Sequence, residues 1–179
     1  MKLSLFIGAE HRPTDSMAQR LSEHVEQVRL ARQLGFDGVS IGNHLSYGST
    51  AWFPLFETLM RLAAEADGMS LGTCMLVLPL YDPLHVAEQG ALLDAASGGR
   101  AILGLAPGWQ EDEFQVMGLD YDRRIGRYVE AVDLIKRPTP RKTSLLKESI
   151  FGLPSSHWPC GQPANPDHLC GSEAASRMP

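Results

Sequence analysis

Residues 71–114 carry the strongest fold signal in the chain, and they read LGTCMLVLPLYDPLHVAEQGALLDAASGGRAILGLAPGWQEDEF. An apolar run over 69–79 is followed by a helical pattern over 83–96 and by a second apolar run over 101–106. This order is typical of two parallel strands joined by a helix. The carboxyl ends of parallel strands meet on one face, where ligands bind. The turn with Pro107 and Gly108 is therefore expected at a ligand-binding edge.

The same alternation extends to both sides of this stretch. Further strands are expected over 2–9 and 38–42, and further helices from a cap at Asp15 or Ser16 to Gly35, over 52–66, over 110–116 and over 123–137. Alternating strands and helices predict an α/β fold with a parallel sheet. Four such repeats equal half of a TIM-barrel-like (β/α)8 fold, which takes about 250 residues. No GxGxxG motif follows the first strand, which argues against a dinucleotide-binding Rossmann fold.

Two helices carry apolar residues at helical spacing, which predicts the face that each one buries. The face expected for the first helix holds Met17, Leu21, Val25, Val28 and Ala31, and that of the last holds Ile125, Val129, Val132 and Ile135.

Composition excludes several classes of protein. The net charge of -5 provides no basic footprint for nucleic acid. No apolar run reaches the ~18 residues of a membrane span, and the start of the chain lacks the features of a signal peptide. Three cysteines make no disulfide framework. The sequence therefore predicts a cytoplasmic globular protein.

The composition changes after residue 137. Residues 138–179 hold seven of the 12 prolines and show no sustained period. We expect an irregular, disordered tail, of the kind that a frameshift, an early stop or a mis-joined gene model would produce. His157, Cys160, His168 and Cys170 are zinc-ligand types, but their spacing fits no common finger, so no metal site is expected.

Several segments of residues 1–137 resemble the luciferase-like monooxygenase superfamily, which includes bacterial luciferase, flavin-dependent monooxygenases and F420-dependent oxidoreductases. They are GTCMLVLPLYDP, LLDAASGGR, ILGLAPGWQEDEF and MGLDYDRR, with Gly35-Phe36-Asp37, Asn43-His44 and Ser97 to Arg100 in register. The resemblance implies the N-terminal half of a TIM-like barrel that binds FMN or F420 at the carboxyl ends of its strands. The family's second half is expected after residue 137, where this sequence departs from the pattern.

His44 is the candidate catalytic residue, and Asn43 beside it is a candidate cofactor contact. A histidine at the end of a barrel strand meets ligands and can titrate near neutral pH. In the family a histidine at this point lies on the flavin and substrate side. The alternative is a loop histidine bonded to the backbone.

Cys74 and Met75 align with the family position that often carries a non-proline cis peptide and a bulge beneath the flavin ring. The resemblance therefore implies that they back the ring; the alternative is that both are ordinary core residues. Phe6 is expected to line the pocket, with a core aromatic as the alternative. Ala106 and Gly108 are small enough for a cofactor to approach the backbone.

The charged residues after the fourth strand have a simpler interpretation. Glu111, Asp112 and Glu113 are interpreted as carboxylates favoured at a helix N-terminus. Acid–base chemistry by a carboxylate pair is the alternative.

The function implied by the resemblance is oxidation of a small organic substrate by reduced FMN and O2, with a flavin reductase as partner. One alternative is an F420-dependent oxidoreductase that transfers hydride. A second alternative is an inactive fragment, or a half barrel that must pair with a second copy.

Overall fold

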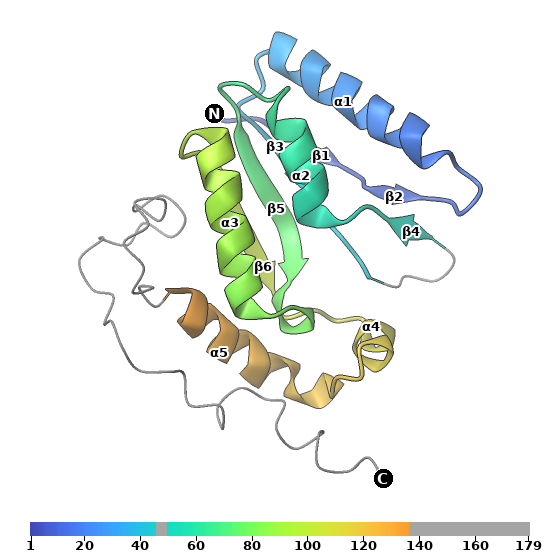
Figure 1. Cartoon of the computed structure of the whole chain (residues 1–179), viewed down its shortest axis with the longest axis vertical. Helices are drawn as coiled ribbons and strands as arrows, with labels where there is room; N and C mark the ends of the chain where they lie inside the picture. The colour runs from blue at the N-terminus through green and yellow to red at the C-terminus, as the bar shows by residue number, and fades with distance from the viewer. Residues whose placement is uncertain (46–49, 137–179) are drawn as a thin grey trace.

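The computed structural model describes residues 1–45 and 50–136. Its centre is a four-stranded parallel sheet in the order β1-β3-β5-β6. The strands are β1 (Ser4–Ile7), β3 (Gly38–Ile41), β5 (Ser70–Val77) and β6 (Ala101–Ala106). Strands adjacent in this order follow one another along the chain, with a helix between each pair (Figure 1). The predicted repeat of strand and helix is therefore confirmed.

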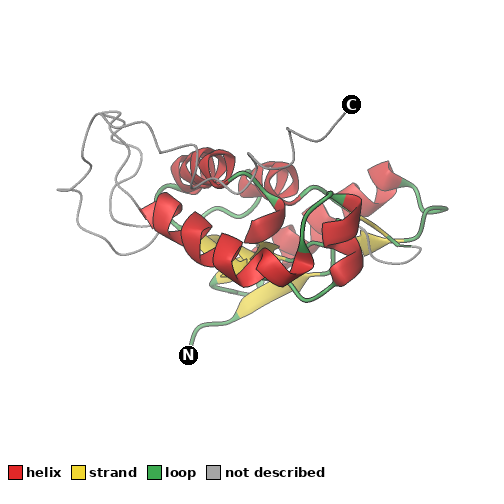
Figure 2. Cartoon of the chain, turned by 90° about the horizontal axis from the view of Figure 1, so that it is seen from below, coloured by secondary structure: helices red, strands yellow, loops and turns green. Residues whose placement is uncertain are grey.

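The helices lie to one side of the sheet (Figure 2). They are α1 (Met17–Gln33), α2 (Leu55–Ala63), α3 (Pro83–Ser97), α4 (Glu111–Val116) and α5 (Arg124–Lys136), with short 3-10 turns η1 (Leu78–Leu80) and η2 (Tyr121–Arg123). Because strand side chains alternate between faces, one set, such as Ile41, Leu71 and Leu103, enters the core beneath the helices. Phe6 and Ile102, on the opposite face, are exposed.

Local sequence signals account for the helix ends. Ser16 accepts a hydrogen bond from the Gln19 amide at the start of α1, and Asp82 accepts from the amides of Leu84 and His85 at the start of α3. Gly98 ends α3 in the left-handed conformation. Because Arg100 donates to the carbonyl of Met69, its side chain ties the turn after α3 to the start of β5.

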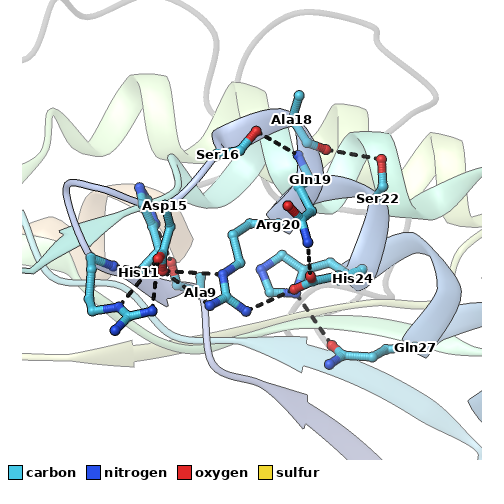
Figure 3. A network of polar contacts seen from close by, with 12 residues as sticks. Ala9, His11, Asp15, Ser16, Ala18, Gln19, Arg20, Ser22, His24 and Gln27 are labelled. Atoms are coloured by element: carbon cyan, nitrogen blue, oxygen red, sulfur yellow. Dashed lines mark hydrogen bonds and ion pairs between the residues drawn. The ribbon is translucent and has the colours of Figure 1, made fainter.

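A charged network fastens the start of α1 (Figure 3). Asp15 accepts from the Arg12 amide at 3.1 Å and from Arg20 Nη2 at 3.1 Å, and Arg20 also pairs with Glu23 at 2.8 Å. One turn on, His24 is buried and packs edge-on against Phe53. This end of α1 is thereby joined to Arg12, which precedes the helix, and to Phe53, which precedes α2.

The sequence did not predict a second, two-stranded antiparallel sheet. It pairs β2 (Glu10–His11) with β4 (Ala51–Trp52). Two-residue strands show no alternation for a pattern to detect. The expected helix start at 52 was therefore wrong: Trp52 belongs to β4, and α2 begins at Leu55 after the extended backbone of Pro54.

Two predicted helix faces need correction. Met17 is exposed, and the buried residues of α1 are His24, Val25, Val28 and Ala31. In α5, Ile125 and Val129 are exposed, whereas Ala131 and Ile135 are buried. The expected tail over 138–179 lies outside the described residues. Within the part of the chain that the structure describes, no helix is both long enough and apolar enough to span a bilayer.

Candidate functional site

The carboxyl ends of β3 and β6 bring together two residues that lie far apart in the sequence. His44 follows β3, and Glu113 lies in the first turn of α4, which follows β6. His44 Nδ1 is 3.1 Å from Glu113 Oε1, and the Leu45 amide donates to the same oxygen at 2.8 Å. The Glu113 side chain is fully buried, with 0% of its surface exposed. A carboxylate therefore holds both the side chain of His44 and the backbone that follows it.

Two tryptophans flank the His44 ring. The Trp52 ring lies 5.1 Å from it at an interplanar angle of 69°, and the Trp109 ring lies 6.2 Å away at 79°, measured between centroids. Trp52 comes from β4, which the sequence did not predict. Both contacts are edge-on, an arrangement that aromatic pairs favour. They restrict the orientation of the imidazole from two sides.

Asn43 is buried, and its amide donates to the Tyr81 hydroxyl at 2.7 Å. Burial raises the pKa of Tyr81, the Asn43 hydrogen bond lowers it in part, and the nearby charges of Glu113 and Glu57 raise it further. A cavity of about 300 Å³ lies beside this pair, and its lining includes Asn43, His44, Trp52, Tyr81 and His85. The predicted catalytic residue therefore borders a ligand-sized space.

Cys74 and Met75 are exposed on the face of the sheet that no helix of the described residues covers. The peptide bond between them is cis, and the pairing of β5 with β6 shifts register between Thr73 and Leu76. A Cβ added at Gly42 would lie 2.8 Å from the Cys74 carbonyl oxygen and 3.3 Å from Phe6 Cζ. Phe6 and the Cys74 backbone thus both lie close to Gly42, where a side chain would have no room.

Ala106 is the last residue of β6, and Gly108 follows it with a positive φ of 78°. A Cβ at Gly108 would lie 2.5 Å from Val77 Cγ1 and 3.2 Å from the Phe114 ring. Only glycine fits this close approach and this backbone conformation. Packing therefore explains Gly108 without a ligand, and cofactor contacts at Ala106 and Gly108 stay predictions.

The predicted residues form two groups in space. Phe6, Cys74 and Met75 lie on the open sheet face, whereas Asn43 and His44 lie at the end of β3 against Tyr81, Trp52 and Glu113. Glu113 was not predicted as a site residue, because three consecutive acidic residues are typical of a helix N-terminus. Glu111 and Asp112 are exposed, in keeping with that interpretation. Only the tertiary packing of α4 separates Glu113 from them.

The family model for luciferase-like monooxygenases matches residues 1–148, and the chain belongs to this family. It is 30% identical over 147 residues to limonene 1,2-monooxygenase of Rhodococcus erythropolis, a match that covers 82% of this chain and 38% of the relative. It is 29% identical over 140 residues to the oxygenase component of the flavin-dependent trigonelline monooxygenase of Acinetobacter baylyi, with 76% and 39% covered. The chain thus spans about two fifths of the length of these relatives.

Solved structures confirm the fold class. Monooxygenase RslO1 of Streptomyces bottropensis superimposes with a TM-score of 0.72 at 25% identity, covering 79% of this chain and 44% of that one. The oxygenating constituent of Pseudomonas putida 3,6-diketocamphane monooxygenase, in complex with FMN, superimposes with a TM-score of 0.68 at 18% identity, covering 76% of this chain and 38% of that one. The coenzyme F420-dependent tetrahydromethanopterin reductase of Methanopyrus kandleri superimposes with a TM-score of 0.52 at 25% identity, covering 66% of this chain and 30% of that one. The four βα units are part of a TIM-barrel-like fold.

Proposed function

We propose that the protein is a flavin-dependent monooxygenase that uses reduced FMN and O2 to oxidise a small organic substrate. The observation that carries the proposal is the placement of His44, held by buried Glu113, at the carboxyl edge of the sheet that also exposes Cys74 and Met75. Family membership supports the reaction class. The names of relatives support the cofactor, since one is called flavin-dependent and another was solved with FMN.

The open sheet face fits the ring of a flavin. Phe6 and Met75 expose apolar surface there, and Cys74 is exposed beside them. A Cβ at Gly104 would lie 2.3 Å from the Thr73 carbonyl oxygen, so the neighbouring strand also presents bare backbone. Exposed apolar side chains next to glycine backbone suit an aromatic ring. Asn43, Ala106 and Gly108 complete the proposed set of cofactor contacts.

When bound, reduced FMN supplies the electrons for the activation of O2. The chain's own residues seat the ring, exclude water and move a proton. Trp52 and Trp109 lie edge-on to the His44 ring and limit its orientation. His44 is the proposed proton-exchanging group, because an imidazole can both accept and donate a proton near neutral pH.

A second candidate is an F420-dependent oxidoreductase that exchanges hydride with its substrate. It is favoured by the match to the coenzyme F420-dependent reductase, at 25% identity. Under the leading proposal, a separate flavin reductase delivers reduced FMN; this partner is supported by the name of the trigonelline relative, an oxygenase component.

Titration of the purified chain with FMN and with F420, each in its oxidised form, tests the proposal. We expect stoichiometric FMN binding and no F420 binding, followed by absorbance and by quenching of cofactor fluorescence. Binding of F420 alone would establish the second candidate. Size-exclusion chromatography of the same samples shows whether one copy or two hold the flavin, and a chain that binds neither cofactor in any state would contradict the proposal.

A further inference from the structure

We infer that Glu113 is a positioning residue, which holds His44 in the tautomer with its hydrogen on Nδ1. The inference deepens the proposed function, since it rests on His44 as the proton-exchanging group. A carboxylate only accepts hydrogen bonds, so the 3.1 Å contact requires His44 Nδ1 to donate. In a neutral imidazole the second nitrogen then carries the lone pair. Nε2 is thus the basic atom of His44.

The cost of burying Glu113 argues against a purely stabilising role. The side chain is fully buried, and among the described residues its Oε2 has no hydrogen-bond partner. A buried carboxylate oxygen without a partner is unfavourable by a few kcal/mol, roughly. An apolar residue of similar volume at such a position is often neutral or stabilising. Burial of an apolar surface therefore does not account for a carboxylate at position 113, whose polar contacts are with His44 and Leu45.

The bond from the Leu45 amide to Glu113 provides a competing, structural explanation. In that case Glu113 only closes the loop after β3, and the protonation pattern of His44 is independent of it. The two explanations differ in the tautomer of His44. They also differ in whether it responds to the charge at position 113.

The experiment measures the tautomer of His44 by NMR of protein carrying ¹⁵N-labelled histidine. Spectra are recorded at alkaline pH, where imidazoles are neutral, and His44→Ala assigns the signal. In the wild-type chain we expect the form with hydrogen on Nδ1 to dominate. In Glu113→Met the ratio of the two tautomers should shift by about tenfold or more toward hydrogen on Nε2, because the acceptor is gone.

Asp112→Asn is the matched control, since Asp112 is exposed on the same helix turn and should leave the ratio unchanged. If circular dichroism shows that Glu113→Met does not fold, the tautomer ratio of His44 is measured in Glu113→Gln instead. It keeps an acceptor for Leu45 and removes the charge, so a smaller shift in the same direction is expected. A wild-type ratio that favours hydrogen on Nε2, or a ratio unchanged in the Glu113 variants, would overturn the inference.

This readout needs no flavin, so it separates the inference from the proposed function. A tautomer shift in a chain that binds no FMN would leave the positioning role standing and sink the flavin proposal. In the flavin-bound enzyme, Glu113→Met should lower kcat by roughly 10²-fold with a much smaller change in KM. Asp112→Asn should change neither value.

Discussion

Tyr81 forms the wall of the candidate site behind Asn43. Its hydroxyl accepts the Asn43 amide at 2.7 Å, and both residues are largely shielded from solvent. The Asn43 amide already donates to Tyr81, and this limits how Asn43 can contact a cofactor. The rest of the Asn43 side chain and its backbone are the parts available to a ligand.

We predict that Tyr81→Phe lowers the free energy of unfolding by roughly 1–3 kcal/mol, because the buried Asn43 amide loses its acceptor. Urea unfolding at neutral pH measures this. The raised pKa of Tyr81 also favours the folded state below the usual range of tyrosine ionisation, and this stabilisation is lost as pH rises through the raised value. The alkaline fall of Tm should therefore be shallower in the variant. Tyr121→Phe, which removes a hydroxyl at a more exposed site, is the control.

The proposed seat of the flavin ring predicts the effect of a charge at Met75. The side chain is 47% exposed, so Met75→Glu should fold normally. A bound ring would cover the new carboxylate, and we expect FMN to bind at least about tenfold more weakly. Met117→Glu, at a position 45% exposed beyond α4, should leave FMN affinity unchanged. Equal affinities in the two variants would contradict the proposed seat.

At the scale of single elements, the start of α1 depends on Asp15. The Arg12 amide lowers the pKa of this carboxyl, burial opposes the shift, and Arg20 adds to it. Because the folded state depresses the pKa, the stabilisation is present above the unfolded value and is lost as pH falls through the folded value.

We predict that Asp15→Asn makes Tm less sensitive to acid, since Asn keeps an acceptor for the Arg12 amide but carries no charge. Thermal unfolding followed by circular dichroism across the acid range measures the slope. Asp133→Asn, on the exposed side of α5, should keep the wild-type slope. An unchanged slope in Asp15→Asn would mean that the network at the start of α1 adds no pH dependence.

The helices also show where periodicity stops being informative. Apolar spacing placed Val25, Val28 and Ala31 inside correctly, but it also placed Met17 inside and overlooked His24. The first turn of α1 extends past the core, and Phe53 offers His24 an aromatic neighbour. In α5, Ile125 and Val129 are exposed because the helix presents Ala131 and Ile135 to the core. A period identifies a helix, whereas its neighbours set which side is buried.

At the scale of the whole molecule, helices cover one face of the sheet, and in the part of the chain that the structure describes none covers the other. Leu103 is 9% exposed beneath the helices, while the adjacent Ile102 is 56% exposed on the helix-free side. Leu103→Ala should therefore lower the free energy of unfolding by about 2–5 kcal/mol. Ile102→Ala should change the free energy of unfolding by no more than roughly 0.5 kcal/mol. Denaturant unfolding compares the two, and similar losses would mean that the open face is covered.

Local patterns in the sequence were sufficient for the strands of the parallel sheet, for a helix cap at Asp15 or Ser16, of which the structure shows Ser16, and for the class of fold. These follow from hydrophobic period, turn chemistry and helix capping, all of which act within a few residues. The family resemblance led from those patterns to His44, Cys74 and Met75. The titration with both cofactors decides between FMN and F420, because the relatives include enzymes of both kinds.

The pairing of β2 with β4 and the contact of His44 with Glu113 came from the three-dimensional arrangement. His44 and Glu113 are 69 residues apart, and they meet because parallel strands direct their carboxyl ends to one edge. No local pattern separates Glu113 from the exposed Glu111 and Asp112, since the three share charge, helix turn and propensity. Burial alone separates them, and burial is a property of the packed chain.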